Sequence, residues 1–80
     1  MQKSLYSREY QQMLKLLRAK RTSAGVSQVE LAQRLDWTQA DVSKCEIGVR
    51  RLDVVELKLW VEALGGDLNG FIAELYGAAA

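Results

Sequence analysis

A short run of polar side chains in the middle of the chain carries groups suited to binding a second molecule. If residues 38–46 form a helix, Val42 and Cys45 face inward, and the opposite face carries Gln39, Ala40, Ser43 and Lys44. A glutamine amide donates and accepts at once, which fits the edge of adenine, and a lysine ammonium can donate to guanine O6 and N7. The spacing therefore predicts an outer face with hydrogen-bonding side chains, opposite the residues that pack inward.

The same stretch raises a difficulty, because residues 34–46 contain three carboxylates and only two basic side chains. Such a segment can lie against a polyanion only if its carboxylates point elsewhere. Asp41 follows Thr38 by three residues, which is the spacing of a capping box, where each side chain accepts from the backbone N–H of the other residue. We therefore expect Asp41 to be used at the start of the helix and not on its outer face.

The elements that position this stretch are also predicted to be helices. Apolar residues at spacings of three and four predict a helix over about residues 7–23, which ends before Gly25. Capping boxes that begin at Ser27 and Thr38 lie about eleven residues apart. This distance leaves room for two helical turns and a turn of about three residues, so two short helices are expected at about 27–46.

The C-terminal part continues the helical pattern. A third capping box begins at Asp53 and predicts a helix to about Leu64, before two glycines, and Asp67 caps a fifth helix over about residues 68–76. The residues that suit the core in the fourth helix are Val54, Leu57, Val61 and Leu64, with Trp60 near them. No strand pattern is present, so the predicted fold is all-α, a compact five-helix arrangement.

Length and composition limit the possible classes of protein. Eighty residues suit a single domain, for which we expect an arm over residues 1–6, a helical core over 7–76 and a flexible tail over 77–80. There is no histidine, one cysteine, no glycine-rich phosphate loop and no paired carboxylates on one predicted face, so no enzyme, metal site or cofactor is expected. The chain also lacks a signal-peptide core and an apolar run near the ~18 residues of a membrane span, which predicts a cytoplasmic protein.

The charge is unevenly distributed along the chain. Residues 1–51 hold ten basic and five acidic side chains, a net charge of +5, whereas residues 52–80 hold one basic and five acidic, a net charge of −4. This division predicts that the N-terminal part faces an anion and that the C-terminal part has another role.

Two short helices joined by a three-residue turn, with a polar outer face on the second, form the helix-turn-helix pattern. Here the chain resembles the phage repressor/Cro-type family, also called the XRE family, whose pattern is roughly S-Q-x-x-L-A-x-x-x-G-[apolar]-[ST]-x-x-x-[IV]-S-x-x-E-x-G-x-R-x-P. The matching residues are Ser27, Gln28, Leu31, Ala32, Thr38, Val42, Ser43, Glu46, Gly48 and Arg50. The resemblance covers about residues 10–75 and implies a lambda repressor-like fold that binds double-stranded DNA.

The resemblance also implies roles for individual residues. Gln28 would contact phosphate at the start of the second helix, where free backbone N–H groups favour an anion. The DNA-contacting set of the recognition helix would be Thr38, Gln39, Ala40, Ser43 and Lys44, with Gln39 and Lys44 at base edges. Arg50 and Arg51 would hold the DNA backbone. The alternative for each of these polar residues is an exposed, solvated position without contact to DNA.

Arg21 has a different implied role, because it occupies the family position whose arginine pairs with the glutamate that closes the recognition helix, here Glu46. The resemblance therefore implies a partly buried Arg21–Glu46 ion pair that ties the first helix to the third. Such a pair orients its elements more than it stabilises them, since desolvation offsets much of the attraction.

Several positions depart from the family pattern. Asp36 stands where the turn has glycine, and aspartate is among the few residues that tolerate positive φ. Trp37 is large for its turn position and is expected to be a core anchor, Cys45 is expected to be buried and structural, and Leu52 replaces a proline. Ile47 leaves two alternatives open, a contact with a sugar or methyl group of DNA or an inward orientation.

These observations favour a sequence-specific transcriptional regulator, expected to be a repressor that binds a two-fold symmetric operator. Excess apolar residues in the last two helices predict a homodimer through them, and Val55 and Leu59 already lie outside the core stripe. The alternative is the DNA-binding antitoxin of a toxin–antitoxin pair, whose protein partner would be the toxin.

Overall fold

The computed structural model describes residues 7–77, and this part of the chain is built from helices alone. The five helices are α1 (Arg8–Ser23), α2 (Gln28–Leu35), α3 (Gln39–Glu46), α4 (Val54–Ala63) and α5 (Leu68–Tyr76). The predicted all-α, five-helix fold is therefore confirmed. The expected arm over residues 1–6 and the last three residues of the expected tail lie outside the described residues.

The helices begin where local hydrogen bonds to side chains allow them to begin. Each helix is preceded by a residue whose side chain accepts from the backbone N–H three positions later, and these caps are Ser7, Ser27, Thr38, Asp53 and Asp67. Full capping boxes form at Thr38 and Asp53. The box predicted at Ser27 is only half formed, because the Glu30 carboxylate accepts from Arg34 Nη2 at 2.8 Å and Glu30 is not paired with the Ser27 N–H.

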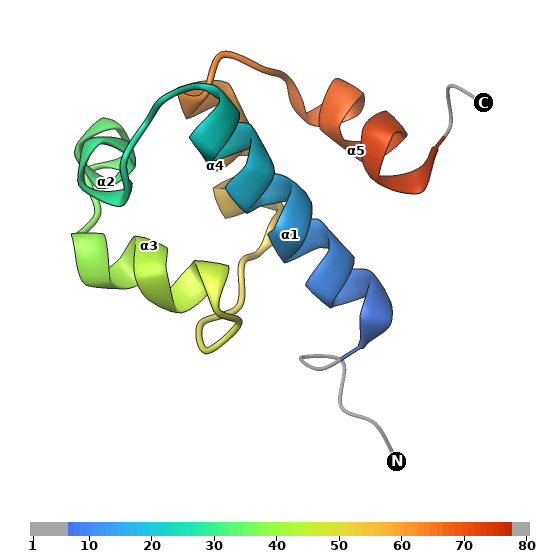
Figure 1. Cartoon of the computed structure of the whole chain (residues 1–80), viewed down its shortest axis with the longest axis horizontal. Coiled ribbons are helices and arrows are strands. Elements are labelled where there is room, and N and C mark those ends of the chain that lie inside the picture. The colour runs from blue at the N-terminus through green and yellow to red at the C-terminus, as the bar shows by residue number, and fades with distance from the viewer. Residues whose placement is uncertain (1–6, 78–80) are drawn as a thin grey trace.

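The longest helix, α1, connects the two sides of the molecule. Figure 1 shows α1 crossing the middle of the view, with α2 and α3 on one side, α5 on the other and α4 behind it. In agreement with this view, α1 packs against both α3 and α5, and α4 packs against α2 and α5. The two short helices of the predicted helix-turn-helix thus rest on α1 and α4, which hold them as a unit.

The core is centred on Trp60, which has no exposed surface although it was predicted only to lie near the core stripe. The Trp37 ring meets it edge to face, at 6.1 Å between ring centroids, so the predicted core anchor packs against the core while remaining half-buried. Leu57 and Val61 of α4 are buried as predicted, but Val54 is 65% exposed. The prediction for Val54 was wrong because this first residue of α4 lies where no other helix covers it.

Two further properties concern the described range. None of the helices within residues 7–77 combines the length and apolar character that a bilayer-spanning segment needs. Histidine, cysteine and acidic side chains do not gather there in groups of three or more that could hold a metal ion.

Candidate nucleic-acid interface

The turn between α2 and α3 depends on the backbone of Asp36. This residue adopts the left-handed conformation, with φ 59° and ψ 39°, and its N–H is directed at the carbonyls of Ala32 and Gln33. The next N–H, of Trp37, donates to the Ala32 carbonyl at 2.9 Å. Asp36 is the one non-glycine residue with positive φ in the described part of the chain, so aspartate here does what glycine does in the family pattern.

The turn directs one face of α3 into the core and the other to solvent. Val42 and Cys45 are completely buried, as predicted. On the outer face Gln39, Ala40 and Lys44 are exposed and Ser43 is half-buried. The structure therefore places four of the predicted contact residues together on one surface, and Thr38 lies exposed at the start of the same helix.

Asp41 is turned toward the start of α3. Its carboxylate accepts from the Thr38 N–H at 3.2 Å, while its own N–H donates to the Thr38 hydroxyl at 3.1 Å. The hydrogen bond from the Thr38 backbone lowers the pKa of Asp41, and the Thr38 side chain acts in the same direction. This carboxylate is therefore ionised and paired with the protein at neutral pH.

Glu46 is the second carboxylate of α3, and it is paired with Arg21 of α1. Arg21 Nε and Nη2 donate to its two oxygens at 2.6 and 3.1 Å, and Arg21 Nη1 donates to the Val26 carbonyl at 2.9 Å. Both side chains are almost wholly buried, with 9% of Arg21 and 3% of Glu46 exposed. The contact joins α1, the α1–α2 connection and the end of α3.

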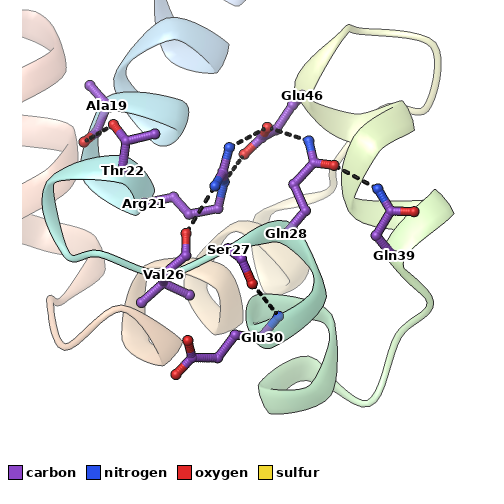
Figure 2. A network of polar contacts seen from close by, with 9 residues as sticks. All are labelled: Ala19, Arg21, Thr22, Val26, Ser27, Gln28, Glu30, Gln39 and Glu46. Carbon is purple, nitrogen blue, oxygen red and sulfur yellow. Dashed lines mark hydrogen bonds and ion pairs between the residues drawn. The ribbon is translucent and has the colours of Figure 1, made fainter.

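Gln28 extends this ion pair into a chain of side chains that ends on the outer face. Its Nε2 donates to Glu46 at 2.9 Å, and its Oε1 accepts from Gln39 Nε2 at 2.7 Å. Figure 2 shows the continuous path Arg21–Glu46–Gln28–Gln39, which connects the first residues of α2 and α3. From the sequence, Gln28 and Gln39 were assigned separate contacts, and their mutual hydrogen bond was missed.

The α3–α4 loop carries the two arginines that were predicted to hold the DNA backbone. Arg51 is exposed, and its guanidinium carbon lies 4.3 Å from the centroid of the Tyr10 ring. Arg50 is half-buried, and its Nη2 and Nη1 donate to Glu56 at 2.7 Å and to Cys45 Sγ at 3.1 Å. Its guanidinium also lies 4.7 Å from the Trp37 ring centroid. The two residues thus have different surroundings, which the sequence did not indicate.

Two exposed apolar side chains lie at the start of this loop. Ile47, for which an inward orientation had been one alternative, is 66% exposed at the end of α3, and Val49 is equally exposed. Between them, Gly48 has φ 86°, and a Cβ added there would lie 3.3 Å from Leu14 Cδ1. Glycine therefore lets the loop pass close to α1.

Cys45 has the surroundings of a structural residue. Burial raises the pKa of its thiol, and the hydrogen bond from Arg50 only partly opposes this shift. The group therefore remains a neutral thiol near pH 7, packed on the inner face of α3, and is not an exposed thiolate.

The sequence and the structure of this chain are both similar to those of known helix-turn-helix proteins. The helix-turn-helix family model HTH_3 matches residues 17–71, which is more than half of the chain. An XRE-family like protein from Pseudomonas syringae pv. tomato has a similar structure, with a TM-score of 0.83, 39% sequence identity and coverage of 90% of this chain and 88% of that one.

A second solved structure, of the clp gene regulator ClgR from C. glutamicum, has a TM-score of 0.77 and 24% identity, and covers 98% of this chain and 100% of that one. At this level of identity, the similarity is evidence for a shared fold alone. No curated protein sequence matched significantly.

Proposed function

This chain belongs to the XRE-type helix-turn-helix family, and from that premise we propose that it is a transcriptional regulator that reads a specific sequence of double-stranded DNA with α3. The observation that carries the proposal is the direction of the carboxylates in α3. The Asp41 carboxylate accepts from Thr38. The Glu46 carboxylate accepts from Arg21 and Gln28. The outer face of α3 is therefore neutral to basic, so α3 can enter the major groove without placing a carboxylate against the phosphates.

Gln39 is the base-reading residue that the geometry supports best. One of its N–H groups is held by Gln28, and Gln28 is itself oriented by the buried Glu46. The second N–H and Oε1 of Gln39 can then pair with adenine N7 and N6, because a glutamine needs one donor and one acceptor for that edge. Lys44 would donate to guanine, Ser43 would bond a base or phosphate, and Ala40 would contact a thymine methyl group.

Phosphate contacts would come from both sides of α3. The first turn of α2 presents backbone N–H groups without helical partners, next to Gln28 and near the start of α3. At the other end of α3, Arg51 is exposed in the loop. Contacts of this kind set the register of the protein on the duplex and make binding depend on salt, whereas the residues of α3 select the sequence.

We also propose that the regulator acts as a homodimer and represses by occupying an operator. The described part of α4 and α5 exposes five large apolar side chains, which are Val54, Val55, Leu59, Ile72 and Tyr76. A two-fold dimer through this surface would bind two half-sites about 34 Å apart, centre to centre. A bound dimer would then exclude RNA polymerase from an overlapping promoter.

Selection of bound sites from random duplex DNA at defined salt tests the proposal. The expected result is a two-fold symmetric site with half-sites about one helical turn apart, and the matched control is the Gln39→Ala/Lys44→Ala variant, whose exposed replacements leave the fold unchanged. Enrichment of a single half-site would support sequence-specific DNA recognition and contradict the proposed dimer. No enrichment over bulk DNA would overturn the proposed regulator.

A further inference from the structure

The two consecutive arginines of the α3–α4 loop are directed at different parts of the fold. Arg51 lies on the ring of Tyr10, which belongs to α1, and remains exposed. Arg50 is turned to Trp37 in the α2–α3 turn and to Glu56 in α4. The sequence pattern assigns both residues to phosphate, but Arg51 is exposed, whereas Arg50 is half-buried and paired with Glu56.

The guanidinium of Arg50 is already used within the chain. Nη1 donates to Cys45 Sγ, Nη2 donates to Glu56 at 2.7 Å, and the planar group stacks near the Trp37 ring. The side chain is 34% exposed and its ion-pair partner 25%. To reach a phosphate, Arg50 would have to give up Glu56 and its cation–π contact with Trp37, and all three side chains are partly buried.

These contacts determine the path of the loop. The N–H groups of Val49 and Arg50 donate to the Lys44 carbonyl at 2.9 and 3.1 Å, and the Leu52 N–H donates to the Tyr10 hydroxyl at 3.1 Å. Between these two anchors, the Arg50 side chain is the link to α4 and to the α2–α3 turn. Since Leu52 stands where the family pattern has proline, no pyrrolidine ring fixes φ at that position.

We infer that Arg50 is a positioning residue for DNA binding and is not a phosphate ligand: its guanidinium holds the loop so that Arg51, the next residue, meets the DNA backbone. The inference rests on the proposed DNA-binding function. It differs from the expectation based on sequence in assigning the phosphate contact of this loop to Arg51 and not to Arg50. Arg51 supplies the charge, and Arg50 supplies the geometry.

The charge-conserving variant Arg50→Lys separates these roles. Lysine keeps the positive charge but lacks the planar fork that bonds two partners and stacks on a ring. The measurement is the slope of the logarithm of the binding constant against the logarithm of salt concentration, whose magnitude falls by about 0.9 for each phosphate that the protein no longer neutralises. We expect Arg50→Lys to reduce this slope by about 0.9 per subunit, although no charge is removed.

The neighbouring residue provides the complementary variants. Arg51→Ala is expected to reduce the slope by the same amount, and Arg51→Lys to retain it, since a phosphate accepts either cation. The double variant Arg50→Lys/Arg51→Ala is expected to reduce the slope no further than either single variant, because both act on the same phosphate. The matched control is Arg34→Lys, which alters an arginine bonded to Ala63 and Glu30 and is expected to retain the wild-type slope.

Each other outcome has a defined meaning. If Arg50→Lys keeps the wild-type slope while Arg50→Ala lowers it, Arg50 is a phosphate ligand and the inference is wrong. If both leave the slope and affinity unchanged, Arg50 acts on stability alone and the inference is equally wrong. A wild-type chain that binds no DNA overturns the proposed function and this inference with it. Should Arg50→Lys not fold, as judged by circular dichroism, Glu56→Gln tests the same anchor and must lower the slope in the same direction.

Discussion

Glu46 receives three donated hydrogen bonds on one buried carboxylate, two from Arg21 and one from Gln28. Removal of the arginine would leave this charge with a single neutral donor in a site that water barely reaches. An unpaired buried charge costs about 3–5 kcal/mol. We therefore expect Arg21→Ala to lose this amount of unfolding free energy, measured by urea denaturation, which is a large share of the stability of a domain of this size.

The control for this prediction is an exposed ion pair of the same kind. Lys58 contacts Glu62 at 3.2 Å on the surface of α4, with both side chains about half exposed. Lys58→Ala is expected to change the free energy by no more than about 1 kcal/mol. Equal effects of the two substitutions would contradict the buried role of Arg21.

Gln39 and Gln28 are expected to act as one unit in base recognition. Gln39→Ala should relax the preference at one base position and cost about 1–3 kcal/mol of specific binding. Gln28→Ala should relax the same position, because the Gln39 amide loses the acceptor that orients it. Competition binding with site variants checks this, and the double variant should lose less than the sum of the two. Additive effects at different base positions would contradict the coupling.

At the scale of single residues, the sequence predicted partners where a family pattern covers both positions. Arg21 and Glu46 could be paired in this way, and the structure places them in contact. The partners of Arg50 could not be predicted, because Trp37 and Glu56 come from separate elements and the tryptophan departs from the pattern. Which of two adjacent arginines pairs with a carboxylate of another element depends on tertiary packing and not on local spacing.

At the scale of elements, the start of α3 is stabilised by an ionised carboxylate. Because Thr38 lowers the pKa of Asp41 in the folded state, the unfolded chain binds a proton here at higher pH than the folded chain does. The contribution to stability is thus present above the unfolded pKa, about 3.9, and is lost as pH falls through and below it. We expect Asp41→Asn to show a smaller loss of unfolding free energy between pH 7 and pH 3 than wild type. An identical acid profile would contradict this role.

The bounds of the helices were predictable because they depend on local chemistry. Caps at Thr38, Asp53 and Asp67 mark the starts of α3, α4 and α5, where a side chain replaces a missing backbone acceptor. The box at Ser27 was overestimated because Arg34, one helical turn further on, competes for the Glu30 carboxylate. Periodicity gave the inward direction of α4 but not the extent to which neighbours cover its first turn, which is why Val54 was misplaced.

At the scale of the whole molecule, the exposed apolar residues proposed as the dimer interface belong to α4 and α5, whereas the residues proposed to read DNA belong to α3. Val55 and Val29 form a matched pair, since each is the second residue of its helix, on α4 and α2, and they are 61% and 53% exposed. We expect Val55→Glu to convert a dimer to a monomer in sedimentation equilibrium, because a carboxylate would be desolvated in the interface.

Val29→Glu is expected to leave the dimer intact and so controls for the added charge. Both substitutions are at exposed positions, so the unfolding free energy of the monomer should change by no more than about 0.5 kcal/mol. A wild-type chain that sediments as a monomer, or a dimer that Val55→Glu does not weaken, would contradict the proposed interface.

The contact between the two tryptophans has an optical consequence. Trp60 is sealed in the core, whereas Trp37 is half-buried beside Arg50 in the turn that precedes α3. A soluble quencher such as iodide should therefore extinguish the emission of Trp37 and spare that of Trp60. Since duplex bound to α3 would lie next to that turn, the quenchable fraction of the natural fluorescence should fall on binding, and a titration could be followed without any attached dye.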